Sequence, residues 1–247
     1  RVKNMGLLSK IITPPYSTIV NQPSSNGNYI FYDTYYGGNF LLLRVDMDFN
    51  LINTIATTPT GAEYTRGIST FYNESCFVCS GFTTPHVFLA NISGEITKIG
   101  TEVKGAGDDD WDGLGQITTN KNGQLYVCDG LNNRVKVYDY GVYSAKVTTP
   151  SKSESIASDD LGFVYCYDRT NKKIKKYTHA LVLSTDWTVT GALAFNSVTD
   201  MAVDNVNNKL YTVNWAQAKI TSFNLDGTGE TDIITGLAVW KIATDGT

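Results

Sequence analysis

The chain is short of charge, histidine and long apolar runs, and each shortage excludes a class of protein. Charged residues make up 18% of the 247 residues, the net charge is −4, and nothing resembles the basic footprint of a nucleic-acid-binding protein. No apolar stretch approaches the ~20 residues that span a bilayer, so no membrane insertion is expected. The only histidines are His86 and His179, and no phosphate-binding, nucleotide-binding or nucleophile-elbow motif is present. The scarcity of histidine and the missing motifs argue against catalysis.

The four cysteines are predicted to be buried thiols. Cys76 and Cys79 form a Cys-x-x-Cys pair, but they lie in an apolar strand pattern where residues three apart point to opposite faces. A zinc site would need further ligands, and Cys128 and Cys166 do not form a second close pair. Metal binding or a disulfide is the less favoured interpretation.

What the chain does contain favours many short strands. Hydrophobic residues reach 42%, which is enough for a core, and the chain has 15 Tyr and 22 Gly beside many Asn and Thr. Tyr and Thr suit pleated surfaces, whereas Asn and Gly suit tight turns. The composition therefore predicts an all-β protein.

One segment shows the repeating unit most clearly, over residues 115–140. A strand (QITT) leads to an Asn-Gly turn at 122–123, and a second strand (LYVCD), a short loop (GLNN) and a third strand (RVKVYDY) follow. Asn-Gly between alternating apolar runs is the strongest short-range hairpin signal.

The same order recurs along the chain at a spacing of about 40 to 45 residues, which is typical of propeller blades. Opening strands are predicted at 67–70, 116–120, 155–159, 200–204 and 241–245, with a weaker copy around 18–21. Second strands are predicted at 29–33, 76–80, 125–129, 163–168 and 210–214, and third strands at 41–46, 87–92, 134–139, 173–178 and 219–224. A more variable fourth strand follows each, as at 50–55, 95–100 and 145–149.

The best copy, LYVCDGLNNRVKVYD at 125–139, resembles the NHL repeat family, whose core reads hydrophobic-Tyr-Val-x-Asp followed by Asn-x-Arg-Val. Ser80 and Asn214 depart from the family's Asp in other copies. The resemblance implies a β-propeller of four-stranded repeats, with residues 1–247 as a single domain. Five complete repeats, and a further blade made by the two ends of the chain, predict six blades. Because Arg1-Val2-Lys3 aligns with a third strand, both termini are expected to close an incomplete last blade. The favoured explanation for the incomplete blade is that the sequence is a fragment of a longer chain.

In a propeller, the loops from fourth to first strand and from second to third strand emerge on the same face. Large aromatic residues are predicted in these loops, and rings on loops are enriched at recognition surfaces. Packing between blades is the alternative interpretation. The candidate ligand-binding residues are Trp111, Trp187, Trp215, Trp240, Tyr35, Tyr36 and Phe82.

An acidic segment matches the start of a calcium-binding loop, with Asp108, Asp110 and Asp112 as the candidate ligands and Gly113 after them. The twelfth position, where such loops carry Glu, is Thr119. A solvated acidic loop is the favoured interpretation, calcium is the alternative, and no other cofactor is expected.

The sequence favours a non-catalytic binding or scaffolding domain that recognises a protein, peptide or glycan through the tryptophan-bearing face. Low charge and richness in Thr, Asn and Tyr suggest an extracellular or cell-surface location. One alternative is a metal-dependent hydrolase or lactonase-like propeller with a site in its central channel. Glu154 and Asp200 precede opening strands there, and Lys241 could neutralise Asp200. A second alternative is a structural module of a larger extracellular assembly, joined through the sixth blade.

Overall fold

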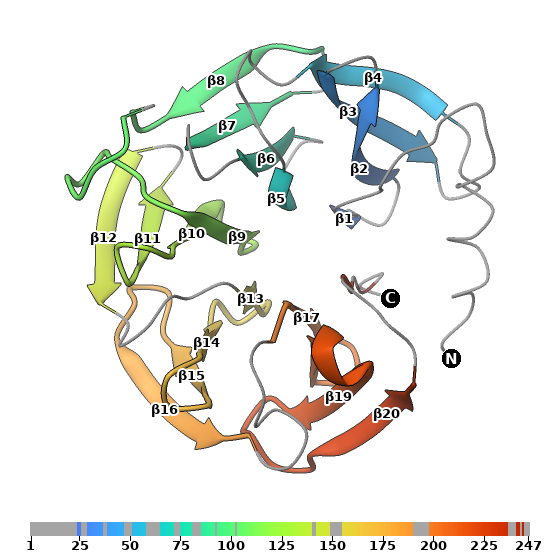
Figure 1. Cartoon of the computed structure of the whole chain (residues 1–247), viewed down its shortest axis with the longest axis vertical. Helices are drawn as coiled ribbons and strands as arrows, with labels where there is room; N and C mark the ends of the chain where they lie inside the picture. Colours follow the sequence, from blue (N-terminus) through green and yellow to red (C-terminus); the bar gives the residue numbers. More distant parts are fainter. Residues whose placement is uncertain are drawn as a thin grey trace.

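The computed structural model places five four-stranded antiparallel sheets in a ring (Figure 1). It describes residues 24–25, 29–36, 39–46, 51–57, 65–71, 75–80, 85–91, 93–101, 103–139, 142–148, 155–189, 198–236, 241–242 and 244. In each sheet, the strand order in space equals the order along the chain, as hairpin connections require. The first strand of each sheet faces the centre of the ring and the fourth lies at the rim (Figure 1).

The strands have the following bounds. The first sheet contains β1 (Ser24–Ser25), β2 (Tyr29–Tyr36), β3 (Asn39–Asp46) and β4 (Leu51–Thr57). The second contains β5 (Thr65–Phe71), β6 (Ser75–Ser80), β7 (His86–Ala90) and β8 (Ile96–Ile99). The third contains β9 (Leu114–Thr119), β10 (Gln124–Asp129), β11 (Arg134–Asp139) and β12 (Val142–Thr148). The fourth contains β13 (Ile156–Ser158), β14 (Val164–Asp168), β15 (Lys173–Tyr177) and β16 (Leu183–Thr188). The fifth contains β17 (Asp200–Asp204), β18 (Lys209–Asn214), β19 (Lys219–Asn224) and β20 (Thr231–Thr235), with the 3-10 helix η3 (Trp215–Gln217) before β19.

The turn chemistry explains why the inner hairpins form where they do. In the β9–β10 turn, the Asn120 side-chain oxygen accepts hydrogen bonds from the backbone N–H groups of Asn122 and Gln124, both at 3.0 Å. Gly123 then adopts a φ of 85°, a conformation that costs glycine little. Asp159 and Gly162 fill the same places in the β13–β14 turn.

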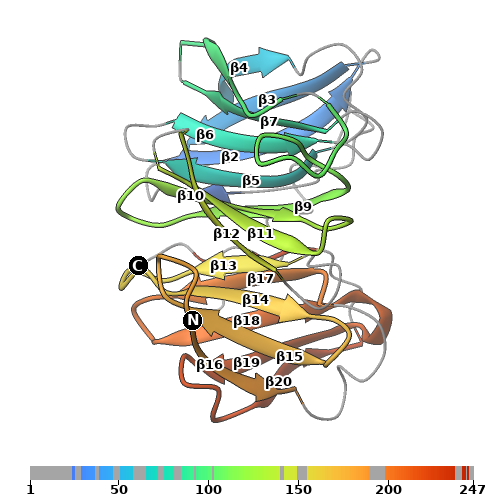
Figure 2. The same cartoon turned by 90° about the vertical axis from the view of Figure 1, so that its left-hand side faces the viewer.

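The core lies between neighbouring sheets, which is how each sheet buries faces that it could not bury alone. One buried cluster joins the second and third sheets, another the third and fourth, and another the fourth and fifth. The third and fourth sheets lie next to each other in the side view as well (Figure 2). At the centre the inner strands approach closely, because a Cβ on Gly67 of β5 would lie 2.7 Å from the backbone nitrogen of Ile117 on β9.

These features confirm the predicted all-β propeller fold. Residues 241, 242 and 244 lie beside β17, as a further inner segment. Ile242 N–H donates to Asp200 at 2.7 Å, and the Thr244 hydroxyl donates to the Val203 carbonyl at 2.7 Å. Five sheets with this sixth inner segment are consistent with the predicted six blades. Residues 1–3 and 18–21, on which the predicted closure and the first opening strand depend, lie outside the described residues. Among the residues that are described, no helix is long and apolar enough to cross a membrane.

Candidate functional site

Trp111 is a core residue and not part of an exposed aromatic surface, so the prediction for this residue is wrong. Its side chain is 0% exposed, its ring lies 5.4 Å from that of Tyr138, and its indole N–H donates to the Ile99 carbonyl at 3.3 Å. The backbone at Gly100 closes over it, because a Cβ there would lie 2.6 Å from the indole nitrogen. The position of the Trp111 ring is explained by packing between the second and third sheets and not by ligand binding.

Trp187 belongs to the rim strand β16 and not to a loop, and it is only partly exposed. Its ring packs edge-on against Tyr165 at 6.2 Å between centroids. A Cβ on Gly227, in the β19–β20 turn of the next sheet, would lie 2.5 Å from the ring. Trp187 therefore acts mainly as a wedge between the fourth and fifth sheets.

The other candidate aromatics stay predictions. Tyr35 and Tyr36 end β2, where their backbones pair with Phe40 and Asn39, so they belong to a strand pair and not to an open loop. Trp215 begins η3. The side chains of these three residues, and Phe82 and Trp240 as a whole, lie outside the described residues.

The acidic segment lies in the connection between β8 and β9, residues 100–113, which we call the β8–β9 loop. Its three candidate calcium ligands point to separate partners. Asp108 pairs with Lys146 at 2.5 Å, which holds the pKa of Asp108 below its usual value. Asp110 accepts from the Thr101 hydroxyl at 2.7 Å, and Asp112 lies 3.3 Å from Lys104. No group of three potential metal ligands forms within the described part of the chain. The structure therefore does not bring the three carboxylates together as a calcium site.

The loop is anchored instead by a buried charge cluster that the sequence reasoning missed. Asp129, at the end of β10, is fully buried and accepts from Arg134 at 2.6 Å and from the Asp112 backbone N–H at 2.7 Å. Lys136 is 0% exposed, and its ammonium lies 3.7 Å from the Asp129 carboxylate and 4.1 Å from the centre of the Trp111 ring. Burial, and then the nearby Arg134 charge, lower the pKa of Lys136 to about 8. The carbonyl and carboxylate oxygens around the ammonium favour its charged form.

A sequence signal for this cluster exists. Arg134 and Lys136 are two apart on the strand RVKVYD, so they share one face of an otherwise apolar strand. A charged pair on one buried face needs partners, and the acidic end of the preceding strand supplies one at Asp129.

The β10–β11 loop, residues 130–133, lies against the β8–β9 loop. The side-chain amide of Asn132 donates to the Gly105 carbonyl at 2.8 Å, and Leu131 N–H donates to the Asp112 carbonyl at 2.9 Å. These bonds place a fourth-to-first and a second-to-third connection on one face, as predicted for a propeller.

Polar residues also meet where the inner strands begin. Gln116 of β9 donates to one oxygen of Asp200, and Ile242 N–H donates to the other at 2.7 Å. The Gln116 oxygen accepts from Ile156 N–H of β13 at 3.3 Å. Burial raises the pKa of Asp200 against the opposing influence of Lys241. Both oxygens of this carboxylate are used to tie inner strands together, which is a structural role. Glu154 lies outside the described residues.

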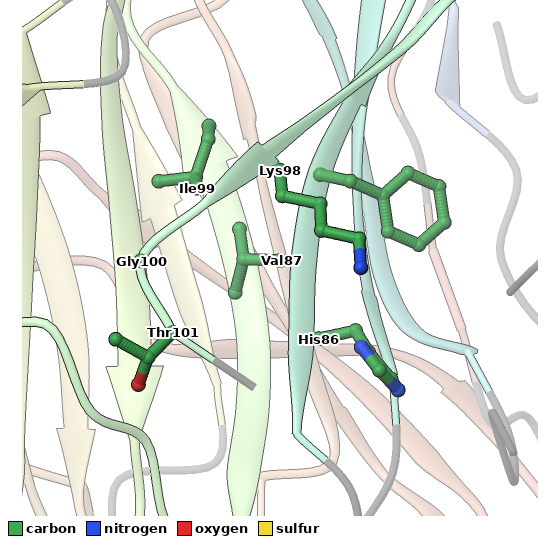
Figure 3. Close-up of a pocket in the computed structure, with 7 residues that line it drawn as sticks. His86, Val87, Lys98, Ile99, Gly100 and Thr101 are labelled. Carbon is green, nitrogen blue, oxygen red and sulfur yellow. The ribbon is translucent and has the colours of Figure 1, made fainter. Parts of the chain in front are cut away.

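A pocket beside β7 and β8 is too small for a substrate. It is lined by His86, Val87, Lys98, Ile99 and neighbouring residues (Figure 3), and its volume is about 10 Å³. That volume holds about one water molecule.

Comparison with known proteins shows the fold alone. No family model matches the chain, and no curated protein matches its sequence, so the resemblance to NHL repeats stays a prediction. A streptogramin B lyase structure is 11% identical, with a TM-score of 0.67, over 91% of this chain and 86% of that one. The crystal structure of a nidogen/laminin complex is 13% identical, with a TM-score of 0.66, over 88% and 81%. A protein of unknown function from Bacteroides caccae is 14% identical, with a TM-score of 0.65, over 92% and 86%.

Proposed function

We propose that the chain is a binding propeller that recognises a protein, peptide or glycan through the face formed by the β8–β9 and β10–β11 loops. One observation carries the proposal: the β8–β9 loop is anchored from beneath, while side chains on both loops remain open to solvent. Val103 is 61% exposed and Leu131 is 48% exposed, and Asp108 and Asp109 of the β8–β9 loop are also exposed.

A long loop that is already held in place loses little conformational entropy when it binds, which is the main advantage of a preorganised surface. Exposed apolar side chains and exposed carboxylates on the same loop favour a partner segment that carries Lys or Arg beside an apolar residue. The neighbour solved as a nidogen/laminin complex supports protein binding in general terms. The lyase among the neighbours keeps the enzyme alternative open, and the hydrolase or lactonase prediction still lacks a site in the described residues.

The predicted role in an extracellular assembly joined through the sixth blade, and the extracellular or cell-surface location, stay predictions. The proposed binding face does not depend on either of them.

The test is a screen of peptide and glycan arrays with the purified chain, followed by titration of the best ligands. The loop variant is Val103→Ser with Asp108→Asn and Asp109→Asn. The control is Leu161→Ser, which alters a still more exposed apolar side chain (78%) in the β13–β14 turn at the other end of the blades. We expect the loop variant to lose at least about tenfold in affinity, and the control to lose little. Ligands that bind the loop variant normally, or no ligand on any array, would overturn the proposal.

A further inference from the structure

The backbone carbonyl groups of the β8–β9 loop point inward onto two side chains of β11. The Lys136 ammonium donates to the carbonyl of Asp108 at 2.8 Å and to that of Asp110, and it lies 3.5 Å from that of Gly107. Arg134 donates to the carbonyls of Ala106 at 2.8 Å, Gly107 at 2.7 Å and Asp110 at 3.2 Å. The turn 106–110 is therefore wrapped around two cations that belong to the protein itself.

This arrangement has the chemistry of a cation site. An ammonium offers three donors, and three carbonyl oxygens, one carboxylate and one aromatic ring surround it. The Asp129 carboxylate supplies the counter-charge from β10, at 3.7 Å. The charged groups that act on Lys136 are Arg134 on its own strand, Asp129 on β10, and Asp108 and Asp109 in the β8–β9 loop.

The loop has a composition that opposes order. It carries four Asp residues, which repel one another, and glycines at 100, 105, 107 and 113, which lose much conformational freedom on folding. Inward carbonyl groups without donors would also be costly. A buried cation answers both problems, because it attracts the carbonyl oxygens and reduces the net negative charge.

We propose that Lys136 is a positioning residue whose ammonium is a built-in cation that orders the β8–β9 loop. The acidic segment that looks like a metal-binding loop in the sequence is thus organised by a tethered ammonium. The link to ligand binding rests on the proposed function. The ordering of the loop does not, and it can be measured with no partner present.

The experiment is hydrogen–deuterium exchange of the free chain, read by mass spectrometry at neutral pH. It follows the loop amides that are hydrogen-bonded within the loop, such as Thr101 to the Asp109 carbonyl at 2.7 Å. In Lys136→Met we expect loop protection to fall at least about tenfold, because bonds to a charged donor are lost. The β14–β15 hairpin should keep its protection. Lys146→Met, which removes a partly exposed lysine bound to Asp108, is the matched control and should change the loop little.

Rescue separates a charged donor from a space-filling side chain. In Lys136→Ala, butylammonium should restore loop protection and butan-1-ol should not. Lys136→Arg, which keeps a charged donor, should retain more protection than the Met variant. If the alanine variant fails to fold, the comparison of the Arg and Met variants decides the question. Normal loop protection in Lys136→Met, equal losses in the Met and Arg variants, or equal rescue by butan-1-ol would overturn the proposal. An ordered loop that binds nothing would overturn the proposed function alone.

Discussion

Asp129 is the anion that both Arg134 and Lys136 face in the buried charge cluster, and we expect Asp129→Asn to be strongly destabilising. The carboxylate faces donors on all sides: Asp112 N–H at 2.7 Å, Arg134 at 2.6 Å and the Asn132 amide at 3.0 Å. An Asn side chain keeps the shape but removes the charge and turns an NH₂ group toward one of these donors. Two buried cations then lose their counter-charge.

Breaking a buried ion pair by removing one partner costs about 3–5 kcal/mol. For a chain of this size, each kcal/mol lowers the melting temperature by about 2–4 °C, so a decrease of roughly 6–20 °C is expected. Differential scanning calorimetry of the wild type and the variant measures it. The matched control is Asp232→Asn, which removes a pair with Lys219 at 2.5 Å whose side chains are 27% and 38% exposed. A partly exposed pair of this kind should cost about 1 kcal/mol or less.

The double variant Asp129→Asn with Arg134→Met separates charge balance from packing. It restores the net charge of the buried cluster, so its loss should be smaller than the sum of the two single losses by about 0.5–3 kcal/mol. Two observations would contradict the predicted role of charge balance. One is an Asp129→Asn melting temperature equal to that of the control, and the other is strict additivity in the double variant.

Three further predictions address packing, backbone conformation and pH. Trp111→Ala should lower the free energy of unfolding by about 3–5 kcal/mol in urea titrations, because it empties a fully buried site; a loss below about 1 kcal/mol would restore Trp111 as a surface residue. Ala218→Gly should raise the free energy of unfolding by about 0.5–1 kcal/mol, seen as a higher urea midpoint, because Ala218 has a φ of 51° that glycine adopts without strain. An unchanged or lower midpoint contradicts this prediction. Burial raises the pKa of Asp200 in the folded chain above its ordinary value, so the stability that this group contributes is present at acid pH and lost as the pH rises through the folded pKa. The free energy of unfolding of the wild type minus that of Asp200→Asn should therefore fall as the pH rises from acid to neutral, and a rise would show that the influence of Lys241 dominates.

The sequence predicted the strands well because the hairpin signals are local. The Asn-Gly turn at 122–123 and the alternating run RVKVYD need only neighbouring residues to define a turn and a strand, and the structure places β10 and β11 there. The placement of the side chains was predicted less well. Whether Trp111 faces solvent or a neighbouring sheet depends on how two sheets pack, which no local pattern encodes. Trp187 was expected in or near a loop but lies in β16, because the rim strands vary most between repeats.

The acidic segment is a second case in which a local sequence pattern does not determine how side chains are placed. The spacing Asp-x-Asp-x-Asp-Gly describes only the order of carboxylates along the chain, whereas a calcium site needs their oxygens to converge. Here the carboxylates pair with separate lysines instead, Asp108 with Lys146 and Asp112 with Lys104, while Arg134 and Lys136 bind the backbone carbonyl oxygens of the loop. A repeat protein can therefore carry a long acidic connection at one blade without a metal ion, provided that the third strand beneath it supplies the cations. The order of the loop therefore depends on its own blade: replacing Arg134 and Lys136 should disorder the loop, whereas changes in the fourth and fifth sheets should not.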